Sequence, residues 1–341
     1  MKLSLIFGNI LMTELVRITV KLANVSKSKK IYHRNDLRQA LSQLSLPPRR
    51  ILWLILAQLN KDDTGCVVYE ENQVFSIHAR EYAALCQIDE SVAYKQLKKG
   101  VEEIRTHLMR VQESELYSKE EFEKRNRPRD GMVLFTIANY GYYSDGSGFI
   151  EVQLDPIMTP FISKLKDNFT GQFLLSALRL PDTNASKLYL LLREWISSGF
   201  MLYKEIEVDE LRDKLGISDV KTYSEFKDFK KLFFQRSIGR ILEATEFSKI
   251  EMEITERRAR KAHKVRIAYE FKGQMGELKE AGFIAGHKKK DKPQDKKPIT
   301  TDGQPQIADK YSADEKGLKQ INGRYHDRQS ATAAGYNWDS L

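Results

Sequence analysis

The sequence has few residues that could bind a metal. Cys66 and Cys86 are the only cysteines in 341 residues, and their spacing suits neither a zinc site nor a disulfide framework. The six histidines include no His-x-His pair, which is the metal-binding pair of rolling-circle nickases. We therefore expect no metal site, no disulfide and a reducing cytoplasm around the protein.

The glycine-rich motifs that hold nucleotides are missing too. Neither G-x-x-x-x-G-K-[ST] nor G-x-G-x-x-G occurs, and there is no clustered Asp motif. We therefore expect no cofactor and no catalytic residue. An enzyme such as a nicking relaxase stays an alternative, because catalytic triads assemble from residues that are distant in the sequence.

The sequence has no long apolar run. A membrane-spanning helix needs about 20 apolar residues, and the run at residues 1–12 is shorter, is interrupted by Asn9 and meets Glu14. It also lacks the small-residue cleavage site of a signal peptide. A true start at Met12 explains this run equally well. We expect a cytoplasmic protein with no membrane partner.

Positive charge is present in excess. Lys and Arg number 56 against 47 Asp and Glu, which gives a net charge of +9 and permits either nucleic acid or an anionic membrane as partner. Between residues 221 and 266, thirteen basic residues stand against seven acidic ones. Most of the excess therefore lies in one short stretch of the chain.

The first half of the chain predicts a helix-turn-helix followed by a β-hairpin, which together make a winged helix. Pro47-Pro48 separates two helices within residues 36–59, because proline suits the start of a helix. A turn-rich segment at 143–148 joins the two strands of the hairpin. The expected elements are helices within 36–59, a strand at 74–77, helices at 81–86 and 91–109, a loop at 112–130, and strands at 132–138 and 149–154.

The second half repeats this order of elements without an evident sequence repeat. Asp209 is expected to cap a helix at 210–215, and Gly216 is expected to end it. The expected elements are helices at 170–180 and 187–197, a strand at 203–208, helices at 210–215 and 222–244, and strands at 249–255 and 265–271.

The predicted fold class is therefore α+β, with two tandem winged-helix domains and a disordered C-terminal tail. Residues 276–341 are rich in lysine, proline and polar residues, which leave little to bury. We expect a partly flexible N-terminal extension at 1–29, a first winged-helix domain at 30–154, a second at 155–275 and a basic, largely disordered tail at 276–341. Any small α+β domain is the alternative for the first half.

The charged stretch of the second domain suggests a DNA-binding face. In the long helix, Lys227, Lys231 and Gln235 are spaced by four and line one outer side, while Phe229 and Phe233 are expected in the core. A helix fits the major groove, where Lys, Arg and Gln can hydrogen-bond base edges. The basic turn that follows would be the wing, lying along phosphates or in the minor groove. The alternative is an ordinary solvated helix face and charged turn.

Several short motifs, in order over two domains, resemble the initiator RepB family of iteron-binding plasmid replication initiators. The resemblance covers roughly residues 30–272, and no single motif is specific alone. The motifs are His33-Arg34-Asn35-Asp36-Leu37, Leu44-Ser45-Leu46-Pro47-Pro48-Arg49-Arg50, Ala93-Tyr94-Lys95-Gln96-Leu97-Lys98, Leu154-Asp155-Pro156, Phe169-Thr170, Leu188-Tyr189, Leu192-Arg193 and Asp228-Phe229-Lys230.

The resemblance implies monomers that bind directly repeated iterons in double-stranded DNA, melt adjacent AT-rich DNA and help load the host helicase with DnaA. It also implies homodimers, formed mainly through the first domain, that bind an operator inverted repeat and repress the initiator's own gene. Base reading maps onto residues 223–236 and the wing onto 257–264. The expected DNA-binding residues are Tyr223, Lys227, Lys230, Lys231, Gln235, Arg236, Arg257, Arg258, Arg260, Lys261 and Lys264, with auxiliary contacts from Tyr94, Lys95, Lys98 and Lys99 in the first domain.

The sequence departs from the family pattern at two places. Arg240-Ile241-Leu242 stands where the family often has Glu-Ile-Asn, and Arg258-Ala259-Arg260 stands where the wing often has Lys-x-Gly-Arg. Alanine adopts positive φ less readily than glycine, so a differently shaped wing turn is expected. A winged-helix transcriptional repressor without an origin function is the alternative to the initiator.

Overall fold

The structure is a computed structural model, and its described residues fall into two units, one within residues 1–287 and the other within residues 288–341. The described residues are 16–19, 25–64, 66–71, 73–117, 119–125, 128, 131–165, 168–200, 202–272, 319–321 and 324–326. In the second unit, β14 (Lys319–Ile321) pairs antiparallel with β15 (Arg324–His326). Apart from these two strands, the predicted disordered tail lies outside the described residues.

The first winged helix is built around α2, whose residues are all buried. Pro47 and Pro48 lie in the first turn of α2, where the missing N–H groups of proline cost nothing. Asp89 caps α4 by accepting a 2.8 Å hydrogen bond from the backbone N–H of Ser91. The elements are β2 (Lys30–Arg34), α1 (Asp36–Ser42), α2 (Leu46–Leu56), β3 (Asn60–Lys61), β4 (Val67–Val68), β5 (Gln73–His78), α3 (Ala79–Cys86), α4 (Glu90–Thr106), β6 (Met109–Gln112), η1 (Glu113–Glu115), α5 (Lys119–Lys124), β7 (Met132–Phe135), β8 (Ala138–Tyr143) and β9 (Phe149–Leu154).

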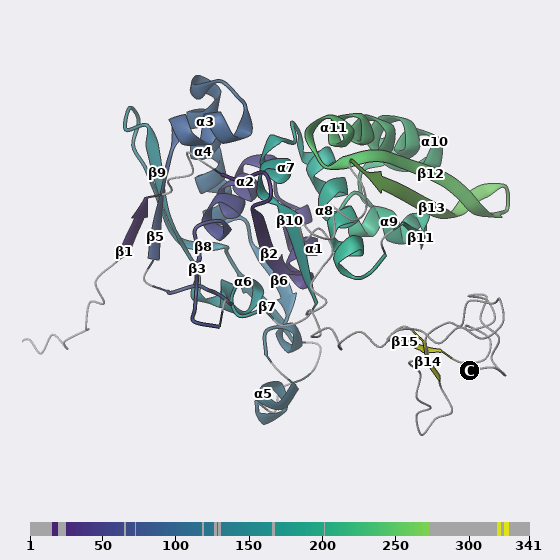
Figure 1. Ribbon diagram of the computed structural model, residues 1–341, viewed down its shortest axis with the longest axis horizontal. Helices are drawn as coiled ribbons and strands as arrows, with labels where there is room; N and C mark the ends of the chain where they lie inside the picture. Colours follow the sequence, from purple (N-terminus) through teal and green to yellow (C-terminus); the bar gives the residue numbers. More distant parts are fainter. Residues whose placement is uncertain are drawn as a thin grey trace, which may run out of the picture. The chain divides into compact units, whose positions relative to one another are not determined.

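A four-stranded sheet in the order β1-β5-β9-β8 carries the hairpin of this half, with β1 (Val16–Thr19) pairing parallel to β5 (Figure 1). The predicted hairpin partner of residues 149–154 was wrong, because β8 at 138–143 pairs with β9. β7 pairs with β6 instead. The segment expected to be only a loop, 112–130, contains η1 and α5.

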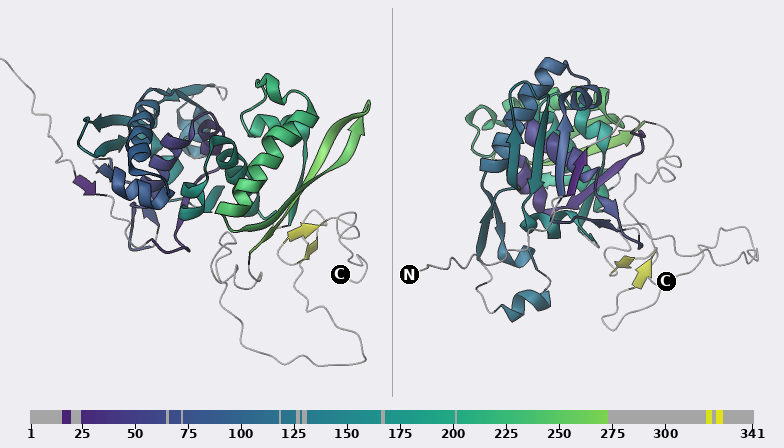
Figure 2. Two further views of the ribbon diagram at one scale, coloured as in Figure 1. Left: turned by 90° about the horizontal axis from the view of Figure 1, so that it is seen from above. Right: turned by 90° about the vertical axis from the view of Figure 1, so that its left-hand side faces the viewer.

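The second half contains a three-stranded antiparallel sheet in the order β11-β13-β12, with helices on one side of it (Figures 1 and 2). Gly216 ends α9 in the left-handed conformation, at φ +61°, as the sequence predicts. The elements are η2 (Pro156–Met158), α6 (Thr159–Ile162), β10 (Phe169–Phe173), α7 (Leu174–Arg179), α8 (Thr183–Ser197), β11 (Tyr203–Glu207), α9 (Val208–Lys214), η3 (Lys221–Tyr223), α10 (Phe226–Asp228), the π-helix η4 (Phe229–Gln235), α11 (Arg236–Ala244), β12 (Phe247–Arg258) and β13 (Lys261–Phe271).

Three local predictions in this half were wrong. Residues 170–173, expected to begin a helix at 170–180, lie in β10, which pairs with β2 at residues 30–34. Glu207 rather than Asp209 precedes the first turn of α9. The long helix at 222–244 is divided into η3, α10, a π-helical stretch and α11. The β2–β10 pairing and one continuous buried core join the two halves of the first compact unit.

Candidate nucleic-acid interface

The inner side of the segment from η3 to α11 is held by phenylalanine rings. Phe229 and Phe233 are buried and stack with their centroids 5.6 Å apart at 23°, and Phe234 is buried beside them. A π-helical turn holds one more residue than an α-helical turn, which lets the neighbours Phe233 and Phe234 both enter the core. π-Helical turns occur often at functional sites, and this one lies in the middle of the predicted base-reading stretch.

The outer side of the same segment carries cations and amides that face solvent. Lys227, Lys231, Gln235 and Arg236 are exposed, and Lys230 is half-buried. Among the residues that the structure describes, none of these four cations has an acidic partner. The extra residue of the π turn leaves Gln235 and Arg236 exposed side by side. Arg236 is therefore added to the exposed row of Lys227, Lys231 and Gln235, which the sequence predicts from their spacing of four.

Tyr223 is engaged inside the protein. Its hydroxyl accepts a 3.1 Å hydrogen bond from Nδ2 of Asn184, and its ring meets Phe233 edge-on, with centroids 5.5 Å apart. Tyr223 is half-buried, so its ring supports the start of the basic segment, as we call residues 221–244 from η3 to α11.

The predicted wing is the tip of the β12–β13 hairpin, which extends away from the helices (Figures 1 and 2). The register of the two strands shifts at Ile254/Glu256 and again at Glu256/Arg257, and such bulges bend and twist a hairpin. The two turn residues both have positive φ, Ala259 at +46° and Arg260 at +68°. That is the conformation that a two-residue type I′ turn requires, and it is usually supplied by Asn-Gly.

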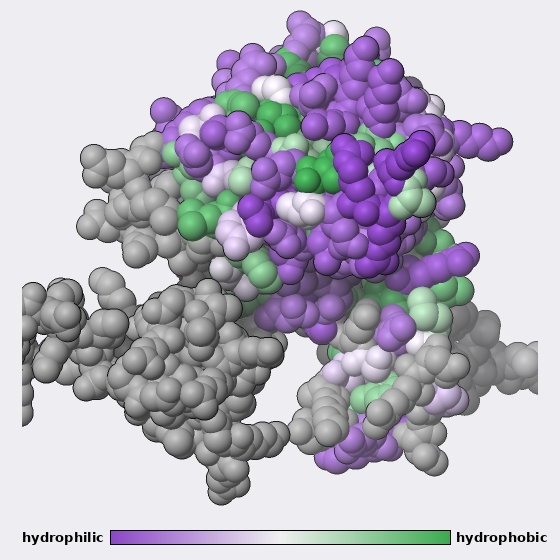
Figure 3. All heavy atoms as spheres, turned by 90° about the vertical axis from the view of Figure 1, so that its right-hand side faces the viewer, coloured by the Kyte–Doolittle hydropathy of each residue, from purple (hydrophilic) through white to green (hydrophobic). Residues whose placement is uncertain are grey.

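The cations of the wing differ in their surroundings. Arg258 donates to Glu256 at 2.7 Å, a hydrogen bond that lowers the pKa of the Glu256 carboxyl. Lys264 lies 3.9 Å from the other oxygen of Glu256. Arg257, Arg260 and Lys261 are exposed and have no acidic partner within the described part of the chain. The face of the molecule at this end is mostly hydrophilic (Figure 3).

Two of the four first-domain residues predicted to make auxiliary DNA contacts instead connect α4 to the turn between β8 and β9. The hydroxyl of Tyr94 donates to the carbonyl of Ser144 at 2.6 Å. Nζ of Lys98 lies 3.2 Å from Asp145, and this hydrogen bond raises the pKa of Lys98. The remaining two, Lys95 and Lys99, are exposed, and no ion pair reaches them from a described residue.

One contact of this region could not be read from the sequence. Arg240, in α11, forms an ion pair with Asp182, which lies 58 positions earlier in the chain. Asp182 caps α8 by accepting hydrogen bonds from the backbone N–H groups of Asn184 and Ala185. No sequence signal links two charges that far apart. Arg240 thus connects the basic segment to the N-terminus of α8.

Among the described residues, no group of three or more His, Cys, Asp or Glu side chains could hold a metal ion. No helix that the structure describes is both long and apolar enough to span a membrane.

Comparisons with known proteins match both halves. The family model "Initiator Replication protein, WH1" matches residues 30–193, and "Initiator Rep protein, WH2" matches residues 207–269. The chain is 30% identical over 263 residues to the PI protein of Escherichia coli, covering 72% of this chain and 84% of that protein. It is 25% identical over 228 residues to an uncharacterized 27.6 kDa protein of Escherichia coli, covering 65% of this chain and 88% of that protein.

A solved structure also matches. The Pi initiator protein, crystallised in complex with iteron DNA, has a TM-score of 0.60 and 30% sequence identity to the chain. The match covers 73% of this chain and 100% of that one.

Proposed function

Because the chain belongs to the initiator replication protein family, with its WH1 and WH2 domains, we propose that it starts plasmid replication by binding directly repeated iterons at the origin. The observation that carries the proposal is the set of exposed cations on the helix and the wing of WH2. They lie in the half of the chain that matches the WH2 model. A relative that is 30% identical has been crystallised with iteron DNA.

In this proposal the basic segment of WH2 enters the major groove. Lys227, Lys231 and Gln235 lie on its exposed side with Arg236, and such side chains hydrogen-bond to guanine, adenine or phosphate. The core side of the segment is fixed by stacked rings. Rigid support of this kind lets the outer side chains approach the bases at a set depth.

The wing supplies the second contact of WH2. Its exposed tip carries Arg257, Arg260 and Lys261, which form no ion pair with a described residue. A narrow hairpin with cations at its tip can lie along phosphates or enter a narrow A·T-rich minor groove, where the negative potential is strongest. Arg258 and Lys264 share Glu256, so they contribute less net charge than the tip does.

The first domain adds contacts through α4. Lys95 and Lys99 are the exposed pair there, and they supply phosphate contacts rather than base reading. Tyr94 and Lys98 act mainly by holding the hairpin turn in place. We propose domains at 30–154 and 155–275, and the pairing of β10 with β2 joins the second to the first.

The further steps of the proposal follow from the family. Bound monomers open the adjacent AT-rich DNA and recruit the host helicase with DnaA, while homodimers bind an inverted repeat and repress the initiator's own gene. The protein works in the bacterial cytoplasm on plasmid DNA. It acts through assembly and DNA distortion, without a catalytic residue or cofactor of its own.

The experiment is a binding titration on the DNA beside the gene. The expected DNA has several direct repeats of about 20 base pairs, two helical turns of 10–10.5 base pairs each, next to an AT-rich tract. The protein should bind a duplex with one repeat more tightly than a scrambled duplex by about a thousandfold or more, the usual margin of a specific DNA-binding protein. Equal binding of both duplexes would refute the proposal. Nicking of supercoiled plasmid in the presence of Mg²⁺ would favour an enzyme instead.

A further inference from the structure

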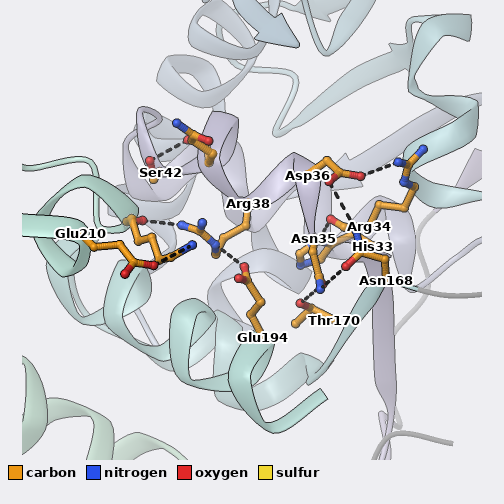
Figure 4. Close-up of polar contacts among 12 residues, drawn as sticks. His33, Arg34, Asn35, Asp36, Arg38, Ser42, Asn168, Thr170, Glu194 and Glu210 are labelled. Atoms are coloured by element: carbon orange, nitrogen blue, oxygen red, sulfur yellow. Dashed lines mark hydrogen bonds and ion pairs between the residues drawn. The ribbon is translucent and has the colours of Figure 1, made fainter. Parts of the chain in front are cut away.

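Arg38 of α1 lies between two elements of the second half of the compact unit. Its Nε pairs with the carboxylate of Glu194 in α8, and its Nη1 donates to the carbonyl of Lys214 at the end of α9 (Figure 4). The side chains of Arg38 and Glu194 are only 7% and 13% exposed. One guanidinium therefore joins α1 to two helices that lie more than 150 residues further along the chain.

The carbonyl of Lys214 needs such a partner. The last carbonyls of a helix receive no hydrogen bond from an N–H of the same helix, so they need donors from elsewhere. Arg38 supplies one, and its rigid planar guanidinium presents separate N–H groups to Glu194 and to Lys214. A lysine would have to reach both acceptors from a single ammonium, so the geometry favours arginine here.

A second observation shows how closely the same elements approach. A Cβ placed on Gly216, the residue that ends α9, would lie 2.6 Å from Oγ of Ser42 at the end of α1. Nζ of Lys187 in α8 donates to the carbonyl of Gly216 at 3.0 Å. The turn after α9 is thus held between α1 and α8, beside the contact made by Arg38.

The helix held in this way leads directly to the DNA-binding surface. α9 packs against β11 and β13, the second of which forms one strand of the wing. The chain then runs from α9 through η3 into the basic segment. A rotation of α9 relative to α1 would therefore change the angle between the WH2 surface and α4 of the first domain.

We propose that Arg38 is a positioning residue that fixes the WH2 surface relative to the first domain, so that both can contact one iteron. The inference rests on the proposed function for its consequence in DNA binding. The positioning itself is independent of any DNA sequence. It can be measured on the free protein.

The chain offers convenient sites for a distance measurement. Cys66 is exposed in the first domain, whereas Cys86 is buried and burial raises the pKa of its thiol to about 11, so it should resist thiol reagents at neutral pH. A second label is introduced at an exposed position of β12 by Ser248→Cys. Spin labels on Cys66 and the new cysteine then report the distance between the domains by pulsed electron paramagnetic resonance.

The expected result is a narrow distance distribution for the parent protein and a broad or shifted one for Arg38→Ala. Glu194→Gln is the matched comparison, because it removes the charge of the α8 partner but keeps an amide oxygen that can accept from Arg38 and leaves the bond to Lys214 in place. It should broaden the distribution less than Arg38→Ala does. Arg38→Lys, with a single ammonium for two acceptors, should give a distribution of intermediate width. It replaces Arg38→Ala in the test if that variant fails to fold. An unchanged distribution in Arg38→Ala and Arg38→Lys, or equal broadening in Glu194→Gln, would overturn the proposal.

A titration with the one-repeat duplex tests the consequence. If the competent orientation falls to about a tenth of the population, the apparent Kd of Arg38→Ala rises about tenfold. Failure of the parent protein to prefer the repeat over the scrambled duplex would refute the proposed function and leave the distance result standing. A broadened distribution with an unchanged Kd would refute the role of positioning in iteron binding.

Discussion

Arg240 of α11 pairs with Asp182, the residue whose carboxylate caps α8. The ion pair places a carboxylate beside the basic segment while tying that segment to a buried helix. The positive charge of Arg240 is thus paired within the protein. The pair is partly exposed, with side-chain exposures of 49% for Arg240 and 28% for Asp182.

This arrangement predicts unequal effects of removing the two partners. Asp182→Ala should lower the free energy of unfolding by about 1 kcal/mol, because it deletes the cap of α8. Arg240→Ala should cost less, within the range of about 0–1 kcal/mol found for exposed ion pairs. Urea titrations of both variants measure this. A larger loss for Arg240→Ala than for Asp182→Ala would contradict the assignment of Asp182 as the cap.

Lys231→Ala should weaken binding to the one-repeat duplex without changing the fold. The lysine is exposed and has no described acidic partner, so its loss removes charge from the side proposed to face DNA. If it contacts a phosphate, the slope of log K against log salt falls by about one. Lys249→Ala is the control, because Lys249 is exposed but lies 3.0 Å from Glu251. An equal effect of both variants would remove Lys231 from the interface.

Ala259→Gly should stabilise the wing. Ala259 has φ +46°, and a left-handed conformation costs a non-glycine residue about 1–2 kcal/mol. We expect a gain of about 1 kcal/mol in the free energy of unfolding, reduced by the greater freedom of glycine in the unfolded chain. Ala262→Gly, in β13, should be destabilising, because glycine weakens a strand interior. Equal thermal shifts in both variants would count against the strained turn.

The buried ring of His33 predicts a pH dependence of stability. Burial lowers its pKa from 6.5 to about 4, so the folded protein keeps His33 neutral where the unfolded chain begins to protonate. The unfolded state then binds more protons between pH 6.5 and 4, and stability falls as the pH falls through that window. The full contribution is about 3 kcal/mol, from 1.36 kcal/mol for each pKa unit.

His33→Phe isolates this contribution. Phenylalanine does not titrate and keeps a ring against Trp53, on which His33 stacks with centroids 5.4 Å apart. Unfolding by urea at pH 7 and pH 4.5 should show a smaller loss of stability in the variant than in the parent protein. The same loss in both proteins would mean that His33 does not carry the effect.

A protein of residues 12–272 should bind the one-repeat duplex with the specificity of the full chain. Every residue proposed to contact DNA lies within this range. The lysines beyond residue 287 would add only non-specific attraction, which is lost as the salt concentration rises. Comparing the preference for repeat over scrambled duplex in the two proteins tests this. A lost preference in the shorter protein would assign a role to one of the ends.

The sequence by itself determined many of the local elements and the place of the charge. The prolines at the start of α2, the left-handed Gly216 and the phenylalanines of the basic segment act through near neighbours, so their patterns are readable from the sequence. Basic residues on one helix and one hairpin predicted the candidate interface for the same reason. The repeats, the plasmid and the host partners came from family resemblance.

Only the tertiary structure decided which distant segments meet. Residues 169–173 pair as a strand with residues 30–34, although the sequence predicts a helix that begins at residue 170. Arg240 meets Asp182, and Arg38 meets both Glu194 and the carbonyl of Lys214. These contacts depend on how whole elements pack. The residues that flank a charged side chain in the sequence do not indicate which distant residue it will pair with. The conformation of Ala259, at φ +46°, likewise follows from the register of two paired strands.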